Sequence, residues 1–241
     1  MQCGIITHIG LVREENQDEV RAKDFGTNIL AVVCDGMGGE RAGKQASSIA
    51  VRELFDHFEA GYHGGMTHEE IRALLVSSVS AANSVIYTTA RMDYKSYGMG
   101  TTCVAAFVQP QWIHIVNVGD SRAYLYEHGV MRQITTDHTV VNMLYQQGKI
   151  TREQMPSHPQ RNMLTQAVGV ERVVKPDFFK IPHEEDFSLL LCSDGLSSYC
   201  SDAEIADIIR QYPFKEVPDT LVVLSLQKGG RDNISLALVT K

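Results

Sequence analysis

The sequence lacks the features of a membrane-spanning, secreted or multidomain protein. No hydrophobic run approaches the length that crosses a membrane, and the first residues do not join a basic region to an apolar stretch. No segment rich in proline, glycine and serine, no low-complexity stretch and no internal repeat divides the 241 residues. We therefore expect a single domain over residues 1–241, with a sizeable core, no signal peptide and no association with membranes.

Cysteine is scarce, and histidine shows no metal-binding pattern. The five cysteines form no C-x-x-C pair, and Cys34 and Cys192 lie inside apolar runs, where a reduced cysteine packs as a small hydrophobic residue. This usage predicts a reducing compartment, which we take to be the cytoplasm. The nine histidines have no metal-ligand spacing, and the sequence has neither a G-x-S-x-G elbow nor an H-E-x-x-H helix.

Positive charge is in deficit, because the formal net charge is -7. This balance argues against nonspecific binding of nucleic acid, which needs a basic surface. Two interpretations remain open. Mildly acidic proteins are common, and carboxylates that cluster to hold cations would give the same balance.

Short apolar runs alternate with amphipathic stretches. The runs that predict buried strands are Leu30–Cys34, Cys103–Val108, Trp112–Val118, Ala123–Tyr126, Ser188–Cys192 and Ile234–Val239. Helices are predicted over Gly43–Phe58, after the capping boxes Thr67–Glu70 and Ser201–Glu204, and over Pro218–Gln227. The short polar turn at residues 109–111 indicates antiparallel pairing. Sheets covered by helices on the outside fit this order, but the pattern alone also allows a three-layer α/β sheet.

Aspartates recur where apolar strands begin or end. Asp35, Asp120 and Asp194 follow such runs, and Asp232 precedes one. A single aspartate in this place is more often a turn former. Four on adjacent strands would gather at one end of a sheet, where uncompensated carboxylates are costly. Hard divalent cations such as Mg²⁺ and Mn²⁺ resolve that cost, so the pattern indicates a metal site with oxygen ligands.

The N-terminal segment adds two candidates to this cluster. Asp18 is a further carboxylate, and Arg13 offers a planar guanidinium suited to bidentate contact with phosphate. An isolated arginine in a charged loop is more often a surface residue, and only the surrounding motifs favour a binding role.

The segment after Asp35 nearly matches two other motifs. Gly38 to Lys44 fits G-x-x-x-x-G-K, but Gln45 stands where a P-loop needs serine or threonine. A cysteine phosphatase needs five residues between its cysteine and arginine, whereas six separate Cys34 from Arg41. A nucleotide-binding enzyme therefore remains an alternative, though a weak one.

Together the segments resemble the metal-dependent serine/threonine protein phosphatases, the protein phosphatase 2C family, and especially its small bacterial members. The matching pieces, in family order, are Arg13-x-x-Asn16-Gln17-Asp18, Asp35-Gly36-Met37-Gly38-Gly39, Gly100-Thr101-Thr102, Val118-Gly119-Asp120-Ser121-Arg122, Thr136-Asp137-His138-Thr139, Leu164-Thr165-Gln166-Ala167-Val168-Gly169, Ser193-Asp194-Gly195-Leu196 and Gly229-Gly230-Arg231-Asp232-Asn233. Each piece is weak alone, but eight in order over nearly the whole chain are specific.

The resemblance implies an α+β fold, a four-layer αββα sandwich of two packed antiparallel sheets flanked by pairs of helices. It also implies two metal ions, Mn²⁺ or Mg²⁺, and hydrolysis of phosphoserine and phosphothreonine by a metal-activated water without a covalent phosphoenzyme. Asp35 would bridge the ions and the Gly36 carbonyl would bind one. Asp194 and Asp232 would complete a shell, Asp18 would support the site, and Arg13 would hold the substrate phosphate.

Asp120 has two interpretations. It either caps its own turn or, if it faces Asp194, contributes to a third and weaker metal site of the kind attributed to some bacterial relatives. The resemblance also implies a flap beside the active site over residues 140–162, for which a plain surface helix and loop is the alternative.

Three positions depart from the family pattern. Met37 stands where some members carry a histidine as a general acid, and Glu40 and Lys44 replace a histidine and a glutamate. None of these removes an expected ligand, so the chain is expected to be catalytic and not a noncatalytic phosphoprotein-binding module. Its expected partners are phosphorylated proteins and an opposing Ser/Thr protein kinase, and it is expected to be a monomer.

Overall fold

The computed structural model describes residues 1–39, 42–92, 96, 98–183 and 186–241. Its strands are β1 (Gln2–His8), β2 (Asp18–Asp24), β3 (Ile29–Met37), β4 (Gly100–Thr101), β5 (Cys103–Val108), β6 (Trp112–Val118), β7 (Arg122–Glu127), β8 (Val130–Gln133), β9 (Asp177–Pro182), β10 (Phe187–Cys192) and β11 (Ile234–Thr240). Its helices are α1 (Ala42–Gly61), α2 (His68–Met92), α3 (Val140–Gln146), α4 (Asp194–Ser197), α5 (Asp202–Gln211) and α6 (Val217–Gln227), with a 3₁₀ turn at Arg152–Gln154.

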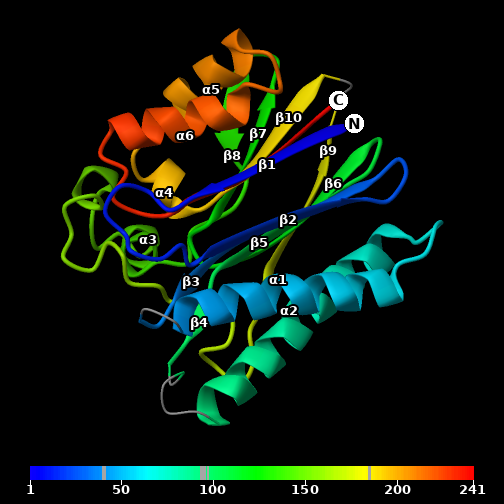
Figure 1. Cartoon of the computed structure of the whole chain (residues 1–241), viewed down its shortest axis with the longest axis horizontal. Helices are drawn as coiled ribbons and strands as arrows, with labels where there is room; N and C mark the ends of the chain where they lie inside the picture. Colours follow the sequence, from blue (N-terminus) through cyan, green and yellow to red (C-terminus); the bar gives the residue numbers. More distant parts are fainter. Residues whose placement is uncertain (40–41, 93–95, 97, 184–185) are drawn as a thin grey trace.

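The strands form two antiparallel sheets. One has the order β1-β11-β10-β7-β8, and the other has the order β2-β3-β5-β6-β9 with β4 attached to β3. The two sheets stack, with α1 and α2 outside one and α5 and α6 outside the other (Figure 1). The predicted four-layer α+β sandwich is confirmed, and the three-layer alternative is wrong.

Three layers of hydrophobic side chains hold these elements together. In β3, Leu30, Val32 and Cys34 pack toward α1 and α2, while Ala31 and Val33 pack toward the other sheet. This alternation follows from the two-residue period of a strand, and it explains why the run is hydrophobic throughout. A third cluster fills the space between the first sheet and α5 and α6. All five cysteines are free.

The predicted helices form where their capping and periodicity place them. The Thr67 N–H donates to Glu70 Oε2 (2.7 Å) before α2, and the capping box of Ser201 and Glu204 opens α5. The stripe of α2 from Ile71 to Ile86 is buried against the core. The segment 140–162 begins with α3 and also contains the 3₁₀ turn at Arg152–Gln154.

The sequence patterns predict the inner strands of both sheets and miss the edges. The six predicted strands are β3, β5, β6, β7, β10 and β11, all of which have a neighbour on both sides. The strands without a prediction are β1, β2, β8 and β9, which form the four edges, together with the two-residue β4. Edge strands have half-exposed side chains, so their hydrophobic pattern is weak.

One expectation about membranes is corrected by α2. This helix is long and apolar enough to span a membrane by length and composition, although no such run was expected. Its serines and threonines are spread among apolar residues, so no continuous apolar run stands out in the sequence. Within the most apolar window, 44% of the residues are buried inside the protein, and they belong to the face of α2 that packs against the core.

Candidate metal centre

A cleft of about 1100 Å³ lies at the end of the sandwich where the chain leaves β3, β6 and β10. In Figure 1 this is the end that carries α3, α4 and the loop after β1. The predicted site residues that line the cleft are Arg13, Asp35, Gly36, Asp120, Asp194 and Asp232. The structure therefore brings these six predicted residues to one cleft.

The aspartates reach the cleft from both sheets. Asp35 lies in β3 and Asp120 follows β6, whereas Asp194 follows β10 and Asp232 precedes β11. The expectation that they gather on adjacent strands of one sheet is therefore wrong. Strands of the two stacked sheets end at the same edge of the sandwich, and this stacking brings the carboxylates together.

Asp35 is fixed through its backbone. Its N–H donates to Thr102 Oγ1 (2.9 Å), and its carbonyl accepts from the Thr102 N–H and the Thr101 hydroxyl (2.8 Å each). The Thr102 hydroxyl lies 2.6 Å from that of Ser121, the residue after Asp120. Thr102 and Ser121 thus link Asp35 to the turn that carries Asp120. Sequence reasoning included them in motifs but assigned them no task.

Gly36 must be a glycine for α1 to approach β3. A Cβ at Gly36 would stand 2.0 Å from the Gly43 carbonyl oxygen, far inside van der Waals contact. The Gly36 backbone is therefore held against the start of α1, next to Asp35. This close approach also places Gly36 in the cleft wall, where its carbonyl was predicted to bind a cation.

Asp18 lies behind the cleft and not in its wall. It pairs with Asp35 across β2 and β3 and is only 1% exposed. The Ser193 hydroxyl donates to its Oδ2 (2.7 Å), which ties β2 to the turn before Asp194. Burial raises the pKa of Asp18 to about 7, although the serine hydroxyls oppose that rise. Asp18 thus lies behind Asp35, beneath the wall of the cleft.

The carboxylates of the cleft raise one another's pKa. Loss of hydration and then repulsion from Asp18 and Asp194 hold the pKa of Asp35 well above its usual range. Loss of hydration and repulsion from Asp120 raise the pKa of Asp194 to about 7, although a hydrogen bond with Asp35 opposes the rise. Loss of hydration, followed by the charge of Asp137, raises the pKa of Asp120 to about 6. The floor of the cleft is therefore a cluster of carboxyl groups whose negative charges repel one another.

Arg13 is the cation at the rim of this cluster. Its Nη2 donates to Asp232 Oδ2 at 2.7 Å, and its side chain is 52% exposed. The guanidinium is therefore accessible from the cleft while one carboxylate holds it. A phosphate group entering the cleft would meet a planar donor already in place.

Asn233 holds the loop that carries Arg13, and sequence reasoning missed this role. Its Nδ2 donates to the carbonyl oxygens of Ile9 (2.8 Å) and Glu15 (3.0 Å), and its Oδ1 accepts from the Gln17 N–H (2.9 Å). One buried amide thus satisfies backbone groups on both sides of Arg13. The signal in the sequence is an asparagine directly after Asp232, but its partners are more than 200 positions away.

The donor set fits a hard divalent cation. Oδ1 of Asp18 and Oδ1 of Asp194 are buried without a hydrogen-bond partner in the part of the chain that the structure describes. Every side-chain or backbone atom expected to bind the metal is an oxygen, the ligand atom that Mg²⁺ and Mn²⁺ prefer. As they stand, no three His, Cys, Asp or Glu side chains of the described residues could together hold an ion. A divalent cation in the cleft would offset the negative charge of these carboxylates.

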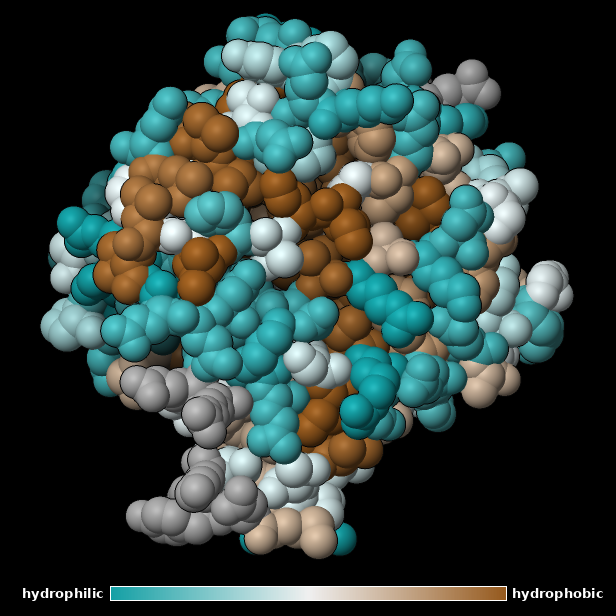
Figure 2. Space-filling view, viewed as in Figure 1, coloured by the Kyte–Doolittle hydropathy of each residue, from teal (hydrophilic) through white to brown (hydrophobic). Residues whose placement is uncertain are grey.

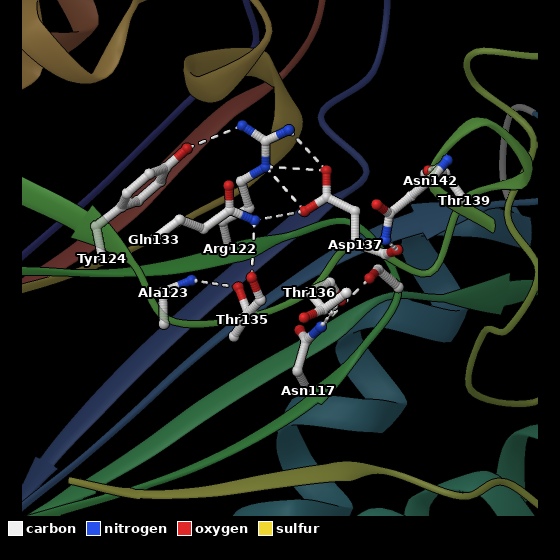
Figure 3. Close-up of polar contacts among 11 residues, drawn as sticks. Asn117, Arg122, Ala123, Tyr124, Gln133, Thr135, Thr136, Asp137, Thr139 and Asn142 are labelled. Atoms are coloured by element: carbon white, nitrogen blue, oxygen red, sulfur yellow. Dashed lines mark hydrogen bonds and ion pairs between the residues drawn. The ribbon is translucent and has the colours of Figure 1, made fainter. Parts of the chain in front are cut away.

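A partly buried ion pair lies at the base of the flap (Figure 3). Arg122 from β7 donates through Nε and Nη2 to both oxygens of Asp137 (2.9 and 2.6 Å) and through Nη1 to the Tyr124 hydroxyl (2.9 Å). The Asp137 carbonyl in turn accepts from Asn142 Nδ2 in the first turn of α3 (2.8 Å). A single bridge between Thr139 and Leu164 closes the segment at its base. The flap therefore begins and ends beside the cleft.

The structure also accounts for two departures from the family pattern. Lys44 donates to Glu19 Oε2 (2.7 Å) and to the Asp18 carbonyl (2.9 Å), so it ties α1 to β2 instead of facing the cleft as a P-loop lysine would. Met37 lines the cleft and has no proton to give a leaving group. Glu40 lies outside the described residues.

Comparisons with known proteins agree with this geometry. Residues 12–235 match the family profile described as Protein phosphatase 2C. The serine/threonine phosphatase stp of Listeria innocua is 39% identical over the whole chain and 96% of its own length. The crystal structure of the serine/threonine phosphatase Stp1 from Staphylococcus aureus superposes with a TM-score of 0.93 at 35% identity, covering 100% of this chain and 94% of that one. The catalytic domain of PstP in complex with two manganese ions superposes with a TM-score of 0.84 at 31% identity, covering 98% and 96%.

Proposed function

Since the chain belongs to the protein phosphatase 2C family and is a serine/threonine protein phosphatase, we propose that it hydrolyses phosphoserine and phosphothreonine with two divalent cations, Mn²⁺ or Mg²⁺, at the cleft floor. The observation that carries this proposal is the convergence of Asp35, Asp194 and Asp232 from two sheets, with a buried Asp194 oxygen that lacks a partner in the described chain. A like-charged cluster of this kind is stable only with a cation or with bound protons.

The proposed role of each residue follows from its position in the cleft. Asp35, the Gly36 carbonyl, Asp194 and Asp232 would hold the cations, with Asp18 supporting Asp35 from behind. When bound, such cations stabilise negative charge and activate water for attack on phosphorus. Thr101 and Thr102 hold Asp35 in place through its backbone, so the carboxylate does not have to be ordered when substrate arrives.

Arg13 would bind the phosphate oxygens of the substrate. Its guanidinium is held at the cleft rim by Asp232, and Asn233 fixes the loop around it. A bidentate contact orients the phosphate and neutralises part of its charge as the ester bond breaks. Met37 cannot supply the proton for the leaving alkoxide, so that proton comes from another group or from water.

Asp120 is proposed as part of a third, weaker metal site. The charge of Asp120 acts directly on Asp194, and both line the cleft. Asp120→Ala should keep the fold, lower turnover several-fold and raise the Mn²⁺ concentration needed for half activity. A variant with unchanged turnover and unchanged metal dependence would leave Asp120 only as the cap of its own turn.

The substrates are phosphorylated proteins, and a Ser/Thr protein kinase is the class of enzyme that must supply them. We further propose that the described chain acts as one catalytic domain and as a monomer in the cytoplasm. The first part is supported by the cleft itself, because its walls come from residues near both ends of the chain.

Hydrolysis of a phosphothreonine peptide and a matched phosphotyrosine peptide, with and without Mn²⁺, tests the function directly. We expect metal-dependent release of phosphate from the first peptide and little from the second. Mn²⁺ should also raise the melting temperature of the wild type but not of Asp194→Ala, because a ligand that binds only the folded state stabilises it. Full activity after exhaustive chelation, or an equal thermal shift in both proteins, would sink the proposal.

A further inference from the structure

The loop that carries Arg13 also exposes two large hydrophobic side chains. Leu11 is 65% exposed and Val12 is 64% exposed, although both are apolar. Val12 lines the cleft beside Arg13, and Met163, 51% exposed, lines it at the end of the flap. Figure 2 shows hydrophobic side chains gathered at the left of this face, over the loop after β1 and the neighbouring end of α6. The cleft therefore carries exposed apolar side chains on its rim, beside the charged Arg13, Glu14 and Glu15 and above an acidic floor.

The rim is held rigidly. The Leu11 N–H donates to the Gly230 carbonyl (2.7 Å), and the Gly10 N–H donates to His8 Nδ1 (2.9 Å). Gly10 has a φ of 84°, and a Cβ there would stand 2.3 Å from the Asp232 carbonyl oxygen. Asn233 clamps the loop on both sides of these residues. These contacts fix the backbone of the loop, so the side chains of Leu11 and Val12 stay exposed.

We propose that Leu11 and Val12 form a recognition surface for the polypeptide of the substrate, so that the enzyme prefers phosphoserine or phosphothreonine with a large apolar side chain close by in the sequence. The proposal rests on the phosphatase function and adds a substrate preference to it. When Arg13 holds the phosphate, the chain on either side of the phosphorylated residue must cross the rim.

Three observations favour a substrate segment as the occupant of this surface. Val12 is continuous with the cleft and adjacent to the phosphate-binding arginine. The loop is ordered before any partner arrives, so little entropy is lost on contact. Met163 adds a further exposed apolar side chain to the lining of the cleft, so an apolar flank of the substrate meets more than one such contact there.

The test compares Val12→Ser with a matched control, Val130→Ser. Val130 is 62% exposed at the start of β8, paired with Glu127 at the end of β7, and β7 runs away from Asp120, so Val130 lies at the far end of its sheet. The probes are phosphothreonine peptides that carry one leucine or one serine at successive positions on either side of the phosphothreonine, with p-nitrophenyl phosphate as a small reference substrate.

We expect at least one leucine position to raise kcat/KM of the wild type about five- to tenfold over its serine counterpart, from burial of one apolar side chain. Val12→Ser should lower that ratio to near one, and Val130→Ser should keep it. Equal kcat/KM for leucine and serine peptides in the wild type, or an unchanged ratio in Val12→Ser, would overturn the proposal while leaving metal-dependent phosphatase activity intact. Self-association that Val12→Ser abolishes, seen by sedimentation, would assign the rim to a second copy of the chain instead.

Discussion

The cleft and the region beneath α2 are two of the places where the sandwich buries titratable side chains. At the cleft, loss of hydration raises the pKa of Asp194 to about 7. Beneath α2, loss of hydration and the nearby charges of His68 and Lys180 lower the pKa of His114 to about 4. There the His114 Nε2 lies 3.1 Å from His68 Nδ1, and His114 is fully buried. The same physical effect acts on both groups.

The consequences differ because the ordinary pKa values differ. A histidine is already mostly neutral in water at pH 7, so burying His114 neutral costs little. An aspartate is charged in water at that pH, so each partly buried carboxylate of the cleft must be discharged or compensated. A fold can therefore keep a buried histidine as packing, whereas a partly buried cluster of aspartates indicates a ligand. Substitutions at the two places should separate these roles.

Asp35→Asn should give the largest effect on catalysis. The amide keeps the shape and the backbone contacts to Thr102 but removes the charge that would hold the cations, so turnover should fall on the order of 10³-fold, as for loss of a central electrostatic group. Steady-state hydrolysis of a phosphothreonine peptide at saturating Mn²⁺ measures this, with circular dichroism to check the fold. Turnover within tenfold of the wild type would mean that Asp35 is not part of the cation site.

Arg13→Ala should give the second-largest loss of catalytic efficiency. Losing a charge-assisted bidentate contact should cost about 1.5–3 kcal/mol in kcat/KM, roughly 10- to 150-fold. Arg52→Ala is the control, because Arg52 is equally exposed and pairs only with its neighbour Glu53 among the ion pairs of the described chain. Unchanged kcat/KM for phosphopeptides in Arg13→Ala would remove Arg13 from the phosphate site and leave it only as the partner of Asp232.

The residues of the cleft and the inner strands could be predicted from the sequence, whereas contacts that depend on how the two sheets pack could not. The four strand-end aspartates and Arg13 are local signals, and all of them reach the cleft. The inner strands are visible because both of their faces are buried, whereas β1, β2, β8 and β9 present one edge to solvent. Pattern cannot show which residues two stacked sheets bring together, and so Asn233 and the Thr102–Ser121 link were missed. His114 lies within a predicted strand, but its partner on α2 follows from packing alone.

Asn233→Ala tests one of the contacts that the sequence did not show. Removing the amide frees the backbone on both sides of Arg13, so kcat/KM should fall about tenfold, with a loss of about 1–3 kcal/mol in stability for the groups left unpaired. Asn28→Ala, which removes a hydrogen bond to Tyr62 where β3 begins, is the control for stability. In the Arg13→Ala background, Asn233→Ala should add little to the catalytic loss. Full additivity would show that Asn233 acts independently of Arg13.

His114→Leu should leave turnover at pH 7.5 unchanged and alter only the pH dependence of stability. The folded pKa of about 4 lies below the ordinary value of 6.5. Above about pH 6.5 the ring is neutral in both states and the shift has no effect. As the pH falls from about 6.5 to about 4, the unfolded chain binds a proton at His114 that the folded chain does not bind. The free energy of unfolding of the wild type therefore falls by up to about 3 kcal/mol, a loss that His114→Leu does not share.

Urea unfolding at intervals over this pH range measures the difference, and His57→Leu, an exposed position on α1, should keep the wild-type profile. Parallel profiles for wild type and His114→Leu would show that the buried ring takes up its proton as readily as an exposed one, and the contrast with the aspartates of the cleft would then fail.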